Sequence, residues 1–349
     1  MTISLEAAGD IAAEDIVVRL AGRQERIHIN LGPLCNNNCI FCMEEDRDLR
    51  YVVNSSLTPE RVRSILEANA GAEEVCFTSG EPTLVEALPE YVSWARDLGY
   101  KKRSVMTNGR RLSYMSYCAK LVKAGMNFFY ISIHGHTPKL HNALVRTAGT
   151  FVQTVGGLDN VTKLRKFGVS LHTSTVITHR NVQYMGEIYQ FLRDHGVQQV
   201  VFNVMQANGR ANTFFDQLFP TYTDIAAQMK RFLDACEEKE PQAFLVDIPL
   251  CTTESLPDFN RGYVEKYVHY EVANLDNGSL DSGDKVAQNA RRSPDGEFLE
   301  ITRADLDDAE RQKRPECASC KYNSDCEGVW KNYLQRYGWD EFKPVLHGD

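Results

Sequence analysis

The sequence lacks several features that would assign it to a special class of protein. It contains no run of about 18 apolar residues, so no membrane-spanning helix is expected. Its N-terminus has no basic segment followed by an apolar one, so we expect a cytoplasmic protein without a secretion signal. It has 39 basic against 47 acidic side chains and a net charge of −8. This acidic balance argues against nucleic acid or an anionic membrane as a partner.

The composition that remains is that of a globular protein with an unusual cysteine content. Of the 349 residues, 25% are charged and 43% are hydrophobic, which excludes disordered and fibrous classes. A chain of this length buries a sizeable core without disulfides. In a reducing compartment, ten cysteines therefore indicate metal ligands or reactive thiols.

Short β-rich runs alternate with amphipathic segments between residues 25 and 240. This rhythm predicts an α/β fold with a parallel sheet, in the form of a partial (β/α)6 barrel, with a flavodoxin-like open sheet as the alternative. The expected strands are Arg26–Leu31, Glu74–Thr78, Ser104–Met106, Phe128–Ile133, Ser170–Ile177 and Gln199–Asn203. The expected helices are 59–70, 86–98, 112–124, 151–167, 182–195 and 222–238.

The rhythm changes near residue 240, where we place a domain boundary. We expect an N-terminal extension over 1–24, the barrel over 25–240 and a second domain over 241–349. The second domain begins with a strand-like segment, 243–248, and ends with a short aromatic helix, 327–337. A polar stretch, 252–316, separates the two.

Three cysteines follow the first expected strand with the spacing C-x3-C-x2-C. One loop can wrap Cys35, Cys39 and Cys42 around a single metal centre, and three ligands leave one position open for chemistry. The alternatives are a zinc knuckle that lacks its fourth ligand, or three unrelated core cysteines.

The segment Cys35–Cys42, with the aromatic Phe41 before its last cysteine, resembles the signature of the radical S-adenosylmethionine (radical SAM) superfamily. Further segments resemble other sequence motifs of that family and follow one another in the same order. Ser79 replaces the first glycine of the family's GGEP motif. These segments are Thr78–Pro82, Thr107–Gly109, Ile131–Gly135, His141, Arg146, Gly149–Phe151, Asn181, and Asn203 through Gly209–Ala211. The resemblance covers residues 25–340.

The resemblance implies that Cys35, Cys39 and Cys42 hold a 4Fe-4S cluster that binds S-adenosylmethionine and cleaves it reductively to a 5′-deoxyadenosyl radical. Gly80 would allow close approach to the methionyl part, Glu81 would receive its ammonium group, and Arg146 would bind its carboxylate. Ser132 would bond ribose or carboxylate. The other expected cofactor contacts are Phe41, Ser79, Asn108 and, for adenine packing, Val204 and Met205.

A second group of cysteines lies near the C-terminus. Cys317, Cys320 and Cys326 resemble part of the array in the SPASM and twitch extensions of radical SAM enzymes, with Cys251 as the first ligand. Trp330 stands where the longer SPASM array continues with cysteine, which indicates one auxiliary 4Fe-4S cluster. The alternatives are a zinc ribbon, and for Cys251 a free thiol near the active site.

Isolated residues provide catalytic candidates. A thiol that donates a hydrogen atom to a substrate radical is expected at Cys236 or Cys251, as in radical SAM epimerases, while Cys76 and Cys118 are expected in the core. His141 is the candidate proton acceptor or substrate contact.

The expected function is that of a radical SAM enzyme acting on an unactivated C–H bond by oxidation, epimerisation or C–C or C–S bond formation. Only 34 residues precede Cys35, too few for an N-terminal peptide-recognition domain. We therefore expect a small natural-product or cofactor precursor as substrate, with a ribosomally made peptide as the alternative. An electron donor such as flavodoxin or ferredoxin is expected. The alternative of another class is a non-catalytic iron–sulfur or zinc protein.

Overall fold

A single parallel sheet of seven strands organises the chain. The computed structural model describes residues 26–32, 34–42, 58–205, 209–236, 242–256, 291–292, 298–299, 311–324, 326 and 328–347. The strands lie in the sheet in their order along the chain, and every neighbouring pair is parallel. They are β1 (Arg26–Asn30), β2 (Glu74–Thr78), β3 (Lys102–Thr107), β4 (Phe128–Ser132), β5 (Ser170–Ile177), β6 (Gln199–Val204) and β7 (Gln242–Val246).

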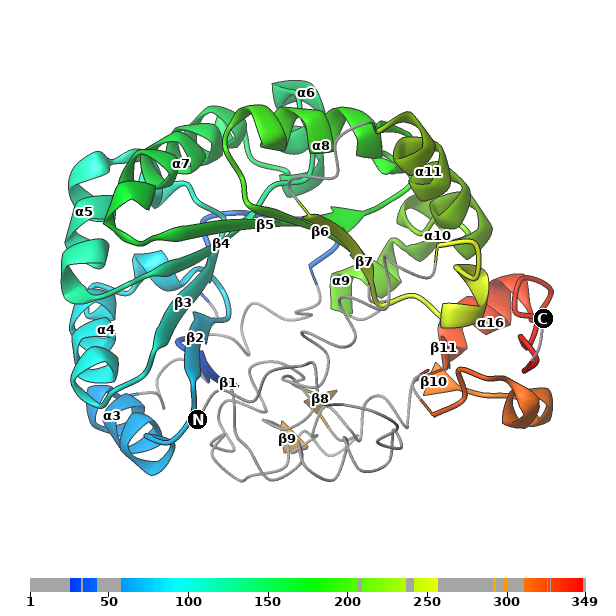
Figure 1. Cartoon of the computed structure of the whole chain (residues 1–349), viewed down its shortest axis with the longest axis horizontal. Coiled ribbons are helices and arrows are strands. Elements are labelled where there is room, and N and C mark those ends of the chain that lie inside the picture. Colours follow the sequence, from blue (N-terminus) through cyan, green and yellow to red (C-terminus); the bar gives the residue numbers. More distant parts are fainter. Residues whose placement is uncertain are drawn as a thin grey trace, which may run out of the picture.

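The strands form an arch whose outer side is covered by helices (Figure 1). The helices on that side are α3 (Pro59–Ala68), α4 (Leu88–Asp97), α5 (Met115–Ala124), α7 (Thr150–Leu164), α8 (Met185–Asp194) and α11 (Tyr222–Ala235). Local sequence signals set their ends: Thr58 caps α3 by accepting the Arg61 N–H at 3.3 Å, and Gly125 ends α5 in the left-handed region. The consecutive strand order excludes the flavodoxin-like alternative, whose first two strands are exchanged.

The core fills the space between the sheet and the outer helices. Ile29, Val75, Phe77 and Phe129 of the first four strands have no exposed surface. Near-continuous burial along β1 and β2 is the pattern of parallel strands that are covered on both faces. The sheet is therefore a rigid support for the loops at its ends.

The six predicted strands are present, and the sheet continues with a seventh strand that the predicted (β/α)6 barrel did not include. The segment assigned to the second domain forms β7, which pairs with β6 from Gln199↔Gln242 to Asn203↔Val246. Burial of apolar side chains on both faces makes β7 an integral edge of the sheet. The sequence analysis also missed α6 (Pro138–Val145), α9 (Gly209–Thr213) and α10 (Phe215–Leu218).

The C-terminal region lies beside the β7 end of the arch (Figure 1). It contains the hairpin β10 (Arg311–Gln312) with β11 (Val329–Trp330), followed by α16 (Lys331–Tyr337), where a helix over 327–337 was predicted. Most of the polar stretch 252–316 lies outside the described residues, apart from β8 (Arg291–Arg292), β9 (Phe298–Leu299) and short flanking segments. Among the described residues, no helix is long and apolar enough to cross a membrane.

Parallel strands bring all their carboxyl ends to one edge of the sheet. The loop with Cys35, Cys39 and Cys42 follows β1 at that edge, and Cys251 follows β7. Because β1 and β7 are the two outermost strands, the two cysteine groups mark opposite ends of the same functional edge.

Candidate functional site

The first thiol loop, residues 34–42, carries Cys35, Cys39 and Cys42, all of them partly accessible free thiols. The three sulfur atoms are close enough that Cys35 and Cys42 each raise the pKa of Cys39, after a larger rise caused by burial of Cys39. Burial and mutual proximity favour the neutral form of these thiols, whereas binding to a cationic centre favours the thiolate form. The donor set therefore fits an iron–sulfur cluster.

Backbone hydrogen bonds attach this loop to two other elements. The Glu81 N–H, just past β2, donates to the Leu34 carbonyl at 2.7 Å. The Asn38 and Ile40 N–H groups donate to the carbonyls of Val145 and Leu144 at 3.1 and 3.0 Å. Those two carbonyls are at the C-terminal end of α6, where they have no partner within the helix. The loop thus satisfies a helix end and is held by it.

Two arginines and an asparagine hold the loop from other strand ends. Arg110 donates to the Asn36 carbonyl and to Asn37 Oδ1 at 3.1 Å. Asn108, after β3, donates to Asn36 Oδ1 at 2.7 Å, and its amide nitrogen lies 4.0 Å from the Cys35 sulfur. The guanidinium of Arg210 in α9 reaches the same loop from the β6 side. Both guanidinium groups place positive charge where an anionic thiolate cluster would lie.

Glu81 is a buried link between strand ends. Its carboxylate is 2% exposed and accepts hydrogen bonds from Thr83 Oγ1 at 2.6 Å, Thr107 Oγ1 at 2.5 Å and the Asn108 N–H at 2.7 Å. Burial raises the pKa of Glu81, and these donors oppose the rise. The carboxylate therefore aligns the loop after β2 with the loop after β3.

The turn after β2 is strained. Ser79 and Gly80 adopt φ values of 70° and 52°, both in the left-handed region. Glycine reaches this region without a steric cost, whereas serine does so at a cost of roughly 1 kcal/mol. The turn directly follows β2 at the carboxyl edge of the sheet, and close approach of a cofactor to it stays a prediction.

Arg146 is the exposed cation of the site. It follows α6 with a φ of 49°, a conformation that is uncommon for a residue with a β-carbon. Its side chain has no hydrogen-bond or ion-pair partner among the described residues. Since Val145 bonds to the first thiol loop, Arg146 stands beside that loop with a guanidinium available for an anion. Ser132, at the end of β4, is half-buried on the same edge.

Phe41 and two histidines pack the first thiol loop onto the end of β4. The Phe41 ring meets His134 edge-on at 4.6 Å, and His134 stacks on His141 at 5.9 Å. The His134 N–H donates to Nδ1 of His141 at 3.2 Å, so His141 is held as a neutral acceptor. Burial lowers the pKa of His141 to about 4, and that side chain has no exposed surface. In this structure His141 packs behind the first thiol loop and binds backbone, and its predicted role as a proton acceptor or substrate contact stays a prediction.

Val204 and Met205, predicted to pack against adenine, follow β6 with 1% and 2% of their surface exposed. Both belong to the hydrophobic core. Only this small exposed area of the two side chains is available for contact with a ligand.

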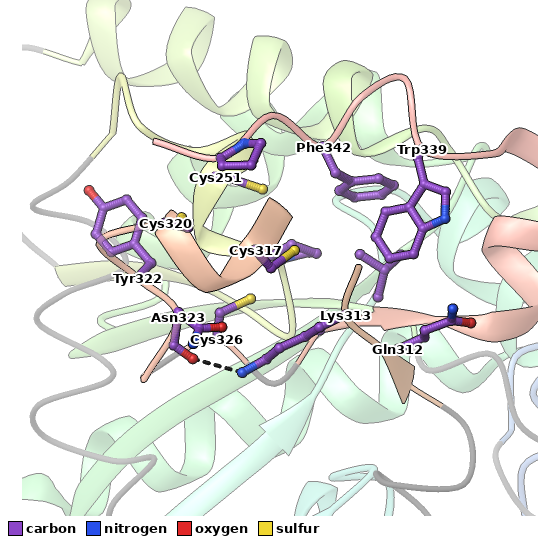
Figure 2. A pocket seen from close by; sticks show the side chains of 14 residues that line it. Cys251, Gln312, Lys313, Cys317, Cys320, Tyr322, Asn323, Cys326, Trp339 and Phe342 are labelled. Atoms are coloured by element: carbon purple, nitrogen blue, oxygen red, sulfur yellow. Dashed lines mark hydrogen bonds between the residues drawn. The ribbon is translucent and has the colours of Figure 1, made fainter. Parts of the chain in front are cut away.

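The second thiol site is a pocket lined by all four predicted cysteines of the C-terminal array. Figure 2 shows Cys251, Cys317, Cys320 and Cys326 on its walls, together with Trp339 and Phe342. Burial, followed by the proximity of the other three thiols, raises the pKa of Cys251 to about 12. The structure thus brings Cys251 to the other three cysteines across more than 60 residues of chain.

Polar contacts hold the segments of this pocket together. Glu254, three residues after Cys251, accepts hydrogen bonds from Lys321 Nζ at 2.6 Å and Tyr322 Oη at 2.5 Å. Lys313 donates to the Asn323 carbonyl at 2.7 Å (Figure 2). Burial raises the pKa of Cys326, and the charge of Lys313 opposes that rise. These contacts join the β7 loop to the Cys320–Cys326 loop, so they align ligands that come from different segments.

The spacing of the thiols bears on the zinc alternatives. Among the described residues, no group of three or more His, Cys, Asp or Glu side chains surrounds a point that a single metal ion would occupy. Ligands of a four-iron cube bind separate iron atoms, so they lie further apart than thiolates that share one zinc ion. The choice between a cluster and a zinc ion at the two thiol groups therefore stays a prediction.

Cys236 lies away from the site, which corrects its prediction as a hydrogen donor. It caps the C-terminal end of α11, and α11 begins at Tyr222 near the functional edge. Fourteen helical residues at 1.5 Å each carry the chain about 20 Å towards the opposite edge, where β7 starts. Cys76 and Cys118 are fully buried in the core, as predicted.

The sequence analysis gave no role to three residues that hold the thiol segments. Arg110 follows Cys42 by 68 residues and Arg210 follows it by 168, while Glu254 lies three residues after Cys251 without any motif. Only the order of the strands brings the arginines to the first loop. The single available signal was the position of Arg110 and Arg210 directly after expected strand ends.

Comparison with known proteins gives one family and several relatives. Residues 29–192 match the family model of the radical SAM superfamily. A probable GTP 3′,8-cyclase of Sulfolobus acidocaldarius is 28% identical over 220 residues, which are 62% of this chain and 66% of that protein. The chain spans about half to two thirds of the length of the curated relatives it matches.

Two solved structures share the fold over most of the chain. Streptococcus suis SuiB bound to the precursor peptide SuiA is 15% identical, with a TM-score of 0.61 over 93% of this chain and 76% of SuiB. The structure of anSMEcpe with bound AdoMet and the Cp18Cys peptide is 16% identical, with a TM-score of 0.52 over 88% of this chain and 89% of that one. At these identities the likeness concerns the fold.

Proposed function

Because the chain belongs to the radical SAM superfamily, we propose that it binds S-adenosylmethionine at a 4Fe-4S cluster held by Cys35, Cys39 and Cys42 and attacks an unactivated C–H bond of its substrate. The observation that carries the proposal is the first thiol loop itself. Its three thiols share one short loop at the carboxyl edge of a parallel sheet, with an exposed, unpaired Arg146 beside them. When bound, the cluster and S-adenosylmethionine supply reductive cleavage and a 5′-deoxyadenosyl radical.

The residues of the chain bind and orient in this proposal. Arg146 offers a planar pair of N–H donors to the methionyl carboxylate. Ser79 and Gly80 offer backbone groups to the ammonium end, and Ser132 offers a hydroxyl from the end of β4. Glu81 and Asn108 keep the loops after β2 and β3 aligned with the cysteines.

We further propose that Cys251, Cys317, Cys320 and Cys326 bind an auxiliary 4Fe-4S cluster in a twitch-like C-terminal extension. Four thiolates would satisfy every iron, and the pocket around them is mainly apolar, which suits electron transfer. In this arrangement Cys251 is a ligand and not a free hydrogen donor. An external donor such as flavodoxin or ferredoxin would supply the reducing electron.

For the substrate we propose a small natural-product or cofactor precursor. The curated relatives include a probable GTP 3′,8-cyclase, whose name specifies a small substrate. A ribosomally made peptide is the second candidate, favoured by the fold shared with SuiB, which was solved with a precursor peptide. A short precursor gene beside the gene for this chain would decide for the peptide.

The experiment that tests the proposed activity is anaerobic reconstitution with iron and sulfide, followed by reduction in the presence of S-adenosylmethionine. The expected products are 5′-deoxyadenosine and methionine, and the Cys42→Ala variant serves as the control that forms neither. A fully loaded wild-type protein that forms no 5′-deoxyadenosine would support the non-catalytic alternative.

A further inference from the structure

One short segment contacts both thiol regions. Residues 209–219, called here the brace, contain α9 and α10 and connect β6 to α11. In Figure 1 α10 lies at the same end of the arch as α16, while α9 lies further inside. The brace therefore extends from the first thiol loop to the C-terminal region.

The inner end of the brace is Arg210. Its backbone N–H donates to the Cys42 carbonyl at 3.0 Å. Its guanidinium nitrogen Nη1 lies 3.0 Å from the Cys39 carbonyl and 3.2 and 2.5 Å from the carbonyl and side-chain oxygens of Asn38. Two of these four contacts bind the backbone carbonyls of Cys39 and Cys42 and the other two bind Asn38, so Arg210 constrains the shape of the loop.

The outer end of the brace packs on α16. Phe215 and Phe219 are buried, and their rings lie 6.2 and 5.2 Å from that of Tyr333. Arg336 bonds Asp216 at 2.7 Å and places its guanidinium 4.4 Å from the centre of the Phe215 ring. The buried aromatic contact is the larger attachment, and the Asp216–Arg336 pair, whose guanidinium also covers the Phe215 ring, is a second and smaller one.

The second thiol pocket is connected to this attachment through a short stretch of chain. Val329 lines the pocket three residues after Cys326, and α16 begins at Lys331, directly after β11. Asn332 of α16 also donates to Asn212 Oδ1 of the brace at 3.1 Å. A displacement of α16 against the brace would therefore move one wall of the pocket.

We propose that the brace sets the position of the first thiol loop relative to the second thiol pocket, with Arg210 as the positioning residue at its inner end. The identity of the two clusters rests on the proposed function, whereas the contacts that define the brace do not. A rigid connection of this kind maintains a constant gap in which a substrate is held between the two metal centres.

Hydrogen exchange on the full-length, metal-loaded chain tests the connection. Phe215→Leu weakens the outer attachment, and Phe232→Leu is the matched control, because Phe232 packs on Tyr189 of the outer helices at 4.7 Å. We expect Phe215→Leu to speed exchange of the amides at 38–42 by about fivefold or more, and Phe232→Leu to leave them unchanged. Faster exchange confined to α10 and α16 would overturn the proposal.

A second pair of variants keeps the test decisive if Phe215→Leu does not fold. Asp216→Arg removes the exposed ion pair by charge repulsion, and adding Arg336→Asp restores it with reversed sign. The single variant should speed exchange at 38–42 and the double variant should return it to the wild-type rate. Wild-type exchange in the single variant would contradict the brace.

Electron paramagnetic resonance distinguishes positioning from general stability. In the fully reduced protein, magnetic interaction between two clusters depends on the distance between them. Phe215→Leu and Arg210→Gln should alter this interaction while Phe232→Leu leaves it unchanged, and identical spectra in all three variants would refute the brace. Wild-type protein that loads no cluster would instead refute the proposed function, while the exchange data still report on the brace.

Discussion

The two thiol regions differ in how they are held and in how many ligands they offer. The first loop brings three thiols together and is fastened from the ends of β2, β3 and β6 and from α6. The second pocket brings four thiols together from the β7 loop and the C-terminal region, fastened mainly through Glu254 and Lys313. Three thiols would leave a coordination position open beside Arg146, which has no partner among the described residues, and such a position suits catalysis. Four thiols in an apolar pocket would close the set, which suits storage or transfer of electrons.

The largest expected effect concerns the number of ligands in the second pocket. We predict that Cys251→Ala lowers bound iron from about eight to about four atoms per chain, as Cys317→Ala does, because all four thiols hold one cube. Cys236→Ala is the matched control and should retain the full amount. Iron analysis after anaerobic reconstitution makes the measurement. Full retention of iron in Cys251→Ala would show that Cys251 is a free thiol.

The next effect tests the open position of the first loop. Replacing Arg146 with glutamine removes the proposed donor pair to the methionyl carboxylate, a charge-assisted contact of about 1.5–3 kcal/mol. We expect the Kd for S-adenosylmethionine to rise roughly 10- to 150-fold, with the iron content unchanged. Arg146→Lys should recover part of the affinity. An unchanged Kd in the glutamine variant, measured by equilibrium binding, would remove Arg146 from the site.

A third effect concerns the buried histidine behind the first loop. The pKa of His141 is about 4 in the folded chain, against about 6.5 when unfolded, so the unfolded chain binds more protons between these values. Stability should therefore fall as the pH drops from 6.5 to 4, by up to about 3 kcal/mol. His141→Gln keeps an acceptor for the His134 N–H and should weaken this dependence, as shown by urea unfolding at pH 7 and 5. Equal pH dependence in both proteins would contradict this origin.

The smallest expected effect is at the strained turn after β2. Ser79→Gly removes a β-carbon from a residue with a φ of 70°, so it should stabilise the chain by about 1 kcal/mol or less. Ser79→Ala keeps the β-carbon and should give no gain, so it is the control for the loss of the hydroxyl. Thermal unfolding of the three proteins makes the comparison, and a lower melting temperature for the glycine variant would show that the serine hydroxyl matters more than the strain.

The sequence predicted the sheet better than the site. Alternating apolar and amphipathic runs located six strands because this signal is local, as are the caps at Thr58 and Gly125 that begin α3 and end α5. The seventh strand was assigned to another domain because its pairing with β6 depends on contacts across the fold. The cysteine spacing indicated both thiol groups, whereas Arg210 and Glu254 gained their roles only through the arrangement of strands and loops. The place of Cys236 at the far end of α11 and the burial of His141 could not be read from the sequence, because neither helix direction nor burial follows from a residue type.

The central claim is that the two thiol regions perform different tasks. It is tested most directly by replacing Cys35, Cys39 and Cys42 with alanine in one protein, and Cys317, Cys320 and Cys326 in another, and measuring 5′-deoxyadenosine formation against bound iron. The account predicts that each variant retains about four iron atoms per chain, and that only the variant with an intact first loop cleaves S-adenosylmethionine. Cleavage by the variant without the first loop would contradict it.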